Sequence, residues 1–155
     1  MAATRPALRN TTLGIRVDGA GKIVRHKQVL GTGGSTRVVD RPAYGIALQV
    51  SGGRILDNDI NHTVALDNGL AHGIFLFKAD GSVIESNRID DVATDTGTPY
   101  GIHILESNNV LVKGNSITQT DRGIYFLIST GKYRNNLTSG VTTPFTGGTD
   151  AGGND

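Results

Sequence analysis

The sequence predicts an all-β chain built as a stack of similar coils, and three observations lead to this prediction. A Gly-Ile pair recurs five times, at intervals of 31, 28, 28 and 22 residues, beginning at Gly14, Gly45, Gly73, Gly101 and Gly123. Apolar residues in each repeat are spaced by two, which is the period of a β-strand. No segment keeps the 3.6-residue period of an ordinary helix. A unit this short cannot close a core alone, so the copies must stack.

Two columns of aliphatic residues are expected to form the interior of the stack. The first column is Ile15, Ile46, Ile74, Ile102 and Ile124, and the second is Val24, Ile55, Ile84, Val112 and Tyr133. Equivalent residues on neighbouring coils would then lie about 4.8 Å apart, which is the spacing of paired strands.

A polar residue follows each of these glycines after 13 or 14 positions. The series is Lys27, Asn58, Asn87, Asn115 and Asn136, with Asn135 as the alternative for the last member. Asparagine tolerates the left-handed backbone of a tight turn, and stacked amides can bond to each other and to turn carbonyls. The sequence therefore predicts a structural asparagine ladder of Asn58, Asn87, Asn115 and Asn136.

These GIxL and VxxNxI repeats resemble the right-handed parallel β-helix, or pectate-lyase-like, superfamily, over about residues 13–138. The resemblance implies a single-stranded right-handed parallel β-helix, a solenoid of about five coils. In that superfamily the first strand of each coil lines a groove, and the loop after the third strand varies in length, as 61–71, 90–99 and 118–121 do here. We expect a lead-in or partial coil at 1–12, the parallel β-helix at 13–141 and an irregular C-terminal tail at 142–155.

Composition excludes several classes of partner and site. The chain of 155 residues has 15 Lys and Arg against 14 Asp and Glu, so no field of one sign would attract nucleic acid or an anionic membrane. Cysteine is absent, which excludes disulfides and thiolate metal sites. No apolar run approaches the ~20 residues of a membrane span. No signal peptide is visible, and localisation is left open.

The outward positions of the first strands should form the face of the groove. They read Arg16, Ala47, Phe75, His103, Tyr125 in one column and Asp18, Gln49, Phe77, Leu105, Leu127 in the next. The resemblance implies that polysaccharide-cleaving members gather several carboxylates on this face, with calcium and an Arg or Lys base in the lyases. Only Asp18 is acidic here, so the sequence favours a module without catalysis in the groove.

The same columns predict an apolar patch of Phe75, Phe77, Leu105, Tyr125 and Leu127 on three neighbouring coils. An exposed patch of this size marks an interaction site. Three readings stay open: the loops or the tail cover it, a second copy binds to it, or a sugar stacks on Phe75 and Tyr125. The ends of a short stack also expose unpaired strand edges, which is a second reason to expect a homo-oligomer.

A further column, directly before each glycine, reads Tyr44, His72, Tyr100 and Arg122. It is interpreted either as a binding strip beside the groove or as an aromatic stack that ends in an arginine.

If the protein is an enzyme, the best catalytic candidates are His103, Asp95, Asp121 and Arg122, because a carboxylate beside an imidazole can exchange protons near neutral pH. His72 and His103 should lie some ~10 Å apart along their strands, too far to share a zinc ion. No metal site and no cofactor are therefore predicted, with calcium on the oxygen-rich loops as the alternative.

The sequence thus predicts a non-catalytic module that self-associates through its apolar first-strand face or its open ends, with polysaccharide as a second expected partner. The alternative is an enzyme acting on uronate-type polysaccharides, namely a lyase, a glycoside hydrolase or an epimerase, or a piece of such an enzyme.

Overall fold

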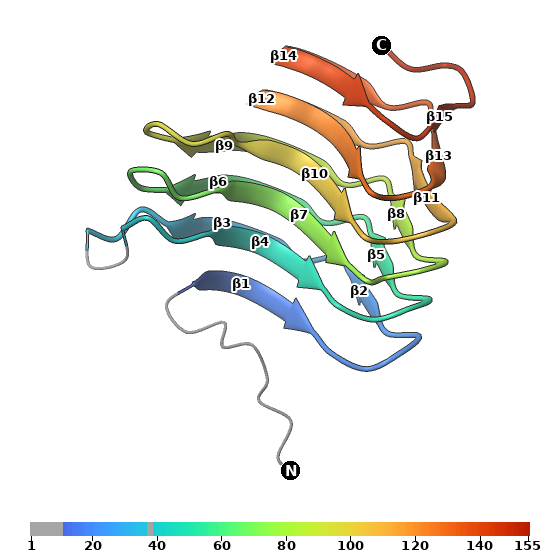
Figure 1. Ribbon diagram of the computed structural model, residues 1–155, viewed down its shortest axis with the longest axis horizontal. Helices are drawn as coiled ribbons and strands as arrows, with labels where there is room; N and C mark the ends of the chain where they lie inside the picture. Colours follow the sequence, from blue (N-terminus) through green and yellow to red (C-terminus); the bar gives the residue numbers. More distant parts are fainter. Residues whose placement is uncertain (1–10, 37–38) are drawn as a thin grey trace.

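The computed structural model describes residues 11–36 and 39–155, and in this part the chain winds into a stack of parallel coils (Figure 1). Most of the expected lead-in at 1–12 lies outside the described residues. Every pair of neighbouring strands in the two sheets is parallel. The predicted all-β parallel β-helix is confirmed.

Three rows of strands run up the stack. The first row is β1 (Thr12–Val17), β4 (Ala43–Leu48), β7 (Ala71–Phe77) and β10 (Tyr100–Leu105). The second is β2 (Ile23–Arg25), β5 (Arg54–Leu56), β8 (Val83–Glu85), β11 (Val110–Lys113), β13 (Gly131–Arg134) and β15 (Thr149–Asp150). The third is β3 (Gln28–Gly33), β6 (Asp59–Ala65) and β9 (Arg88–Thr94).

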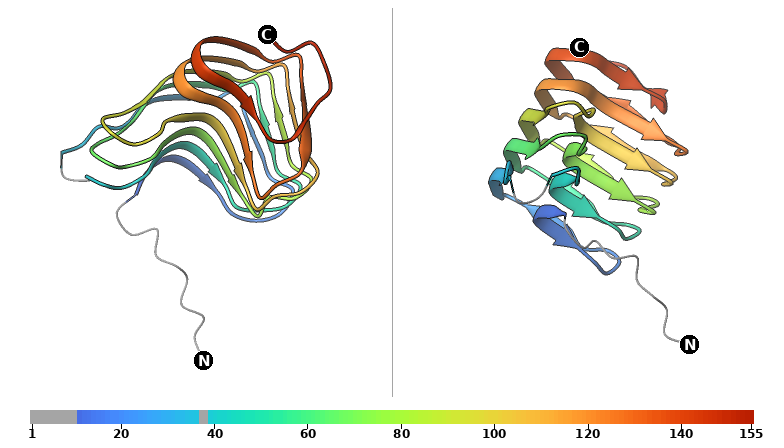
Figure 2. Two further views of the ribbon diagram at one scale, coloured as in Figure 1. Left: turned by 45° about the horizontal axis from the view of Figure 1, so that its top comes forward. Right: turned by 60° about the vertical axis from the view of Figure 1, so that its left-hand side comes forward.

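The long strands β12 (Ser116–Leu127) and β14 (Leu137–Thr146) join the third row to the first. The first part of β12 pairs with β9 and its last part pairs with β10, so coil four passes from the third row to the first without the loop that coil three makes between β9 and β10. The loops after β3, β6 and β9 therefore project on one side of the lower coils only (Figure 2). This change in coil length leaves a step in the surface beside β12.

The predicted interior columns are confirmed by register and burial. In the first column each residue is paired with the next one on the adjacent coil, through Ile15, Ile46, Ile74, Ile102 and Ile124. The second column is paired in the same way, through Val24, Ile55, Ile84, Val112 and Tyr133. The middle members of both columns are fully buried. A single apolar core therefore runs the length of the stack.

The asparagine ladder is also confirmed. The side-chain amides of Asn58, Asn87 and Asn115 each donate to the side-chain oxygen of the next asparagine, at 2.9, 2.9 and 3.0 Å. Each amide also donates to a carbonyl of an earlier turn, as Asn87 does to Ile55 at 3.0 Å. Asn136 rather than Asn135 continues the series, because Asn136 is the buried one of the two.

The expectation of an irregular tail at 142–155 is wrong, because these residues complete a sixth, shorter coil (Figure 2). Phe145 occupies the column of Ile124 and stacks on Tyr133 with ring centroids 5.0 Å apart. Asn154 accepts the amide of Asn136 at 3.0 Å and so extends the ladder. Threonine and glycine occupy most positions in this part of the sequence, so the alternation of apolar and polar residues that predicts a strand is not visible there.

Among the described residues there is no helix whose length and hydropathy would let it cross a membrane.

Candidate binding face

The repeated glycines shape the outer surface of the first row. A Cβ on Gly45, Gly73 or Gly101 would come within 2.5–2.6 Å of a buried isoleucine methyl group of the third row, so these glycines face the core. The isoleucine that follows each of them is also buried. Two consecutive residues can face inward only where the strand bends. Because of this bend, the residue before each glycine lies on the same outer face as the residue two positions after that glycine.

This bend brings together two columns that are separate in the repeat pattern. Tyr44, His72 and Tyr100 stack with ring centroids 4.9 and 5.2 Å apart, and the Arg122 guanidinium lies 5.5 Å from the Tyr100 centroid. The column thus has the geometry of an aromatic stack that ends in an arginine, which is one of its two interpretations. His103 lies beside it, with its ring centroid 4.6 Å from that of Tyr100.

The expected separation of His72 and His103 is wrong, because their ring centroids are only 5.2 Å apart. Counting residues along a straight strand overestimates this distance, since the bend at Gly73 and Gly101 brings neighbouring columns together. The two imidazoles are stacked, with an interplanar angle of 20°.

The expected exposure of the first-strand face is only partly found. Phe75 is 9% exposed and packs with Tyr44 and Ala47 in a small apolar cluster, so its predicted exposure is wrong. The rings before the glycines enclose it, with Tyr44 and His72 centroids 5.0 and 5.1 Å away. Phe77, Leu105 and Tyr125 are half-buried, and Leu127 is 37% exposed.

The two histidines of this face are held in a low-polarity environment. Both ring nitrogens of His103 and Nδ1 of His72 are buried without a hydrogen-bond partner among the described residues. Burial, with a smaller contribution from the Arg122 charge, lowers the pKa of His103 to about 4. Burial, together with the charge of His103, also lowers the pKa of His72 well below its usual value. Both rings are therefore neutral at pH 7.

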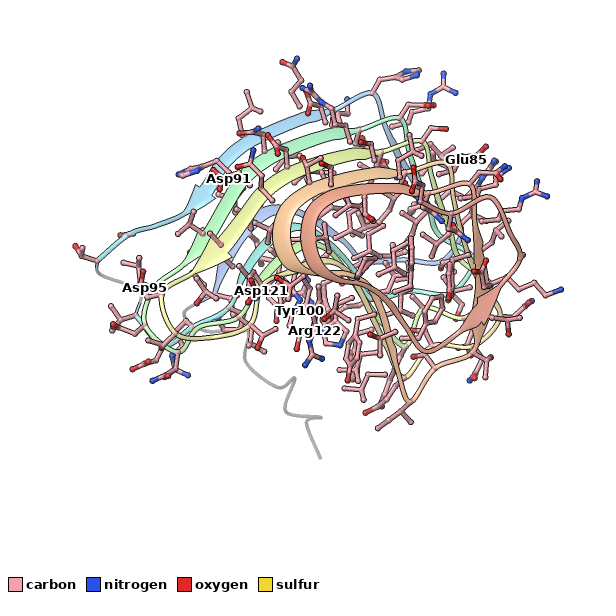
Figure 3. All side chains as sticks on the ribbon, turned by 90° about the horizontal axis from the view of Figure 1, so that it is seen from above. Glu85, Asp91, Asp95, Tyr100, Asp121 and Arg122 are labelled. Carbon is pink, nitrogen blue, oxygen red and sulfur yellow. The ribbon has the colours of Figure 1, made fainter. Side chains whose placement is uncertain are left out.

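The four catalytic candidates do not form one constellation. Figure 3 shows Asp95 at the outer end of its loop, well away from Asp121, Tyr100 and Arg122. The Asp95 carboxylate accepts the backbone N–H of Asp67 at 3.0 Å. The Arg122 guanidinium lies over the rings of Tyr100 and Tyr125. His103 is enclosed on both nitrogens, so the proton transfer expected of a base has no path to substrate in this arrangement.

An apolar ledge lies at the far end of the first row, and we define it as the half-buried Phe77 and Leu105 with the exposed Leu127 and Ile128. In coil five the chain passes from the first row to the second between Tyr125 and Lys132. In coil six the equivalent connection, from Thr146 to Thr149, is shorter. Coil six turns early at Gly147 and Gly148, which lie against Phe126. Leu127 and Ile128 therefore project beyond the coil above them.

Ile128 is not among the residues that the repeat pattern predicts for this face. Its side chain is 76% exposed and its backbone is left-handed, with φ at 51°. Lys78 and Glu106 have left-handed backbones at the corresponding corners of coils three and four, where each donates its N–H to the next coil. The signal available in the sequence is a β-branched residue where the two preceding coils place a charged one.

Within residues 11–36 and 39–155, no group of three or more His, Cys, Asp or Glu side chains lies close enough together to hold a metal ion.

Stacked parallel coils, a buried amide ladder and a lateral aromatic face define the class of this protein as a parallel β-helix domain. Residues 4–148 match the family described as periplasmic copper-binding protein (NosD), and the chain belongs to that family. Among curated proteins no sequence matches.

Two solved structures are similar to parts of the chain. The periplasmic alginate epimerase AlgG is 23% identical, with a TM-score of 0.45, over 64% of this chain and 28% of that protein. QnrB1, a plasmid-mediated fluoroquinolone resistance protein, is 13% identical, with a TM-score of 0.22, over 90% of this chain and 78% of that one. The chain thus spans less than a third of AlgG, and similarity at these levels assigns no activity to it.

Proposed function

We propose that this NosD-family domain is a non-catalytic module that self-associates through the apolar ledge. The observation that carries the proposal is Ile128, which is both exposed and left-handed. A left-handed backbone costs a residue with a Cβ roughly 1–2 kcal/mol, and an exposed isoleucine gains little from burial in return. Burial of Ile128 and Leu127 by a partner would recover the hydrophobic contribution that the monomer lacks.

The partner that fits this ledge is a second copy of the chain. Lys78 and Glu106 lie beside the ledge and pair at 3.6 Å. Opposite charges next to one apolar strip make a self-complementary surface, because a two-fold axis can bring Lys78 of one copy to Glu106 of the other. The net charge of +1 adds little long-range repulsion between copies.

Light scattering over a range of concentrations tests this proposal. The native chain should increase in mass with concentration, and Ile128→Asn should keep the mass at that of the monomer. The same substitution should stabilise the monomer by about 1 kcal/mol, since asparagine tolerates the left-handed backbone. Leu30→Asn is the matched control, because Leu30 is exposed on β3, away from the ledge. A native chain that stays monomeric at high concentration would refute the proposal.

Polysaccharide binding by stacking on Phe75 and Tyr125 receives less support from the ring geometry. Phe75 is enclosed by neighbouring rings, and the Arg122 guanidinium lies 4.7 Å from the Tyr125 centroid. A sugar ring needs a free aromatic face, and the faces of the stacked column already contact each other.

Copper is the ligand suggested by the description of the family, and the described residues do not fit it. A metal bound by imidazole lies in the plane of the ring, and the nearly parallel planes of His72 and His103 have no common point at bonding distance. The chain has no cysteine and a single methionine. A chelator competition with copper(I) should therefore show no stoichiometric binding. Tight binding that is lost in His103→Gln would contradict this conclusion.

A further inference from the structure

The outer surface of the second row combines positive charge with aliphatic side chains. The buried column of this row is flanked on both sides by residues that face away from the core. We define the flanking residues of coils one to five as the basic face: Ile23, Arg25, Arg54, Leu56, Val83, Glu85, Leu111, Lys113, Lys132 and Arg134. Five of these ten side chains are cationic, four are aliphatic and Glu85 alone is acidic.

Most cations of the basic face have no counterion. Lys113 pairs with Glu85 at 2.9 Å. The other four cations are exposed and form no ion pair or side-chain hydrogen bond among the described residues, and they are Arg25, Arg54, Lys132 and Arg134. Their charges are therefore available to an anionic partner.

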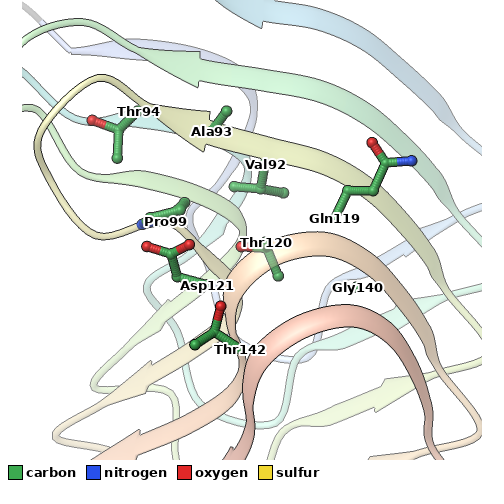
Figure 4. A pocket seen from close by; sticks show the side chains of 9 residues that line it. All are labelled: Val92, Ala93, Thr94, Pro99, Gln119, Thr120, Asp121, Gly140 and Thr142. Carbon is green, nitrogen blue, oxygen red and sulfur yellow. The ribbon is translucent and has the colours of Figure 1, made fainter.

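Half of the acids in the chain lie on the third row and on the segments that lead from it to the first row. They are Asp40, Asp59, Asp67, Asp90, Asp91, Asp95 and Asp121. Asp121 borders a hollow next to β12 to which no lysine or arginine contributes (Figure 4). Figure 3 shows Asp91 and Asp95 on one side of the stack and Glu85 on the other. The net charge of +1 thus sums two faces of opposite sign, whereas composition excludes a field of one sign only where charges are evenly mixed.

We propose that the basic face binds the surface of a membrane that contains anionic phospholipids. Paired strands lie about 4.8 Å apart, so the five coils present their cations as a strip roughly 19 Å long, and several can reach headgroup phosphates at once. Each lysine or arginine near such a surface contributes about fivefold in affinity. Ile23, Val83 and Leu111 lie between the cations and can enter the boundary between headgroups and acyl chains. Ile23 is 53% exposed, so it gains most from this contact.

The uncharged residues of the basic face favour a membrane over a nucleic acid. They are all aliphatic and offer no hydrogen-bonding group to the edges of bases. The face includes no aromatic ring, whereas single-stranded nucleic acids are held largely by stacking on such rings. A nucleic acid could therefore use only the cations, and a substitution of Ile23 distinguishes the two partners.

Co-sedimentation with vesicles tests the proposal, with phosphatidylcholine alone and with phosphatidylcholine mixed with phosphatidylglycerol. The native chain should bind only the anionic vesicles, and added salt should weaken binding because it screens exposed charges. The double variant Arg54→Gln, Lys132→Gln should bind about 25-fold more weakly. Ile23→Asn should bind about fivefold more weakly, since it removes a partly exposed aliphatic side chain.

Two substitutions on the opposite side are the matched controls. Arg41→Gln removes an exposed cation from the loop before β4, and Leu30→Asn removes a side chain that is 61% exposed on β3. Both variants should bind vesicles as the native chain does. Single-stranded and double-stranded DNA, at the same phosphate concentration, should bind more weakly than the anionic vesicles.

Membrane binding goes beyond the self-association proposed above and is tested separately from it. The same measurements in the Ile128→Asn background remove any gain from several linked copies on one vesicle, and the order of the variants should stay the same. The proposal is overturned if anionic vesicles are not bound, or if the double variant or Ile23→Asn binds them as the native chain does. It is also overturned if DNA binds as tightly as the vesicles.

Discussion

The side-chain amide of Asn154 donates to the carboxylate of Asp150 at 2.6 Å, and this contact ends the asparagine ladder. In the four bonds before it, the acceptor is always the side-chain oxygen of the next asparagine. The same Asp150 oxygen also accepts the N–H of Gly152 at 2.7 Å. The last amide of the stack is thus satisfied within its own coil.

We predict that Asp150→Ala loosens the sixth coil without unfolding the rest. Both Asn154 and Gly152 lose their acceptor, which corresponds to a local loss of about 1–2 kcal/mol. Hydrogen exchange of residues 137–155 should accelerate about five- to thirtyfold, while residues 43–105 should be unaffected. Asp150→Asn keeps a carbonyl acceptor and should restore most of the protection. Equal exchange in all three proteins would show that the bond does not hold the coil.

Removal of a central ladder residue should have a much larger effect. The Asn87 side-chain oxygen accepts both the N–H and the amide of Asn58, and its own amide donates to Ile55 and Asn115. Asn87→Ala leaves these buried groups without partners, so we expect a loss of about 3–5 kcal/mol in the free energy of unfolding.

Urea denaturation measures this change. Asn108→Ala is the control, since Asn108 is exposed and bonds through its side chain only to the Thr130 hydroxyl among the described residues. Its loss should stay below about 1 kcal/mol. Similar costs for both variants would mean that burial of the ladder does not determine its energy.

The repeated glycines give a steric prediction. A Cβ at Gly73 would come within 2.5 Å of an Ile89 methyl group and 2.8 Å of the Gly101 carbonyl oxygen. Gly73→Ala should therefore destabilise the fold by about 2–4 kcal/mol. Gly52→Ala should cost only about 1 kcal/mol, because Gly52 has a left-handed backbone but open space around its Cα. The reverse order in thermal melting would contradict the inward bend at the Gly-Ile repeats.

The core and the ladder could be predicted from the sequence because they depend on register alone. Once Ile46, Ile74 and Ile102 are aligned, parallel pairing fixes every column between them. The last coil was harder to predict, since Phe145 is the single large apolar residue of its segment and its stacking partner Tyr133 lies in the second row, outside the column of Phe145. Asn154 continues the ladder after only 18 residues, and the Gly-Ile pair that marks the earlier coils is missing there.

The binding face was predicted less completely, because it depends on a bend that counting along a strand ignores. The spacing from His72 to His103 suggests two separate columns, whereas the bend at Gly73 and Gly101 stacks the rings. The step in the surface beside Asp121 and the exposure of Ile128 both arise because neighbouring coils differ in length. The sequence shows how many residues each coil has, but only the structure shows on which side of the coil the extra residues lie.

The enclosed imidazoles predict a specific loss of stability in acid. His103 has its pKa lowered to about 4 in the folded chain, against about 6.5 in the unfolded chain. As the pH falls from 6.5 towards 4, the unfolded chain takes up a proton that the folded chain does not bind, so stability decreases across this window. Above pH 6.5 the ring is neutral in both states and contributes no pH dependence.

The urea midpoint at pH 7.5, 6 and 5 measures this effect. Between pH 7.5 and 5, His103→Phe should lose about 2 kcal/mol less stability than the native chain, since phenylalanine keeps the ring packing and does not titrate. If His103→Phe shows the full native loss, His103 does not resist protonation in the fold, and the neutral aromatic face described here is incorrect.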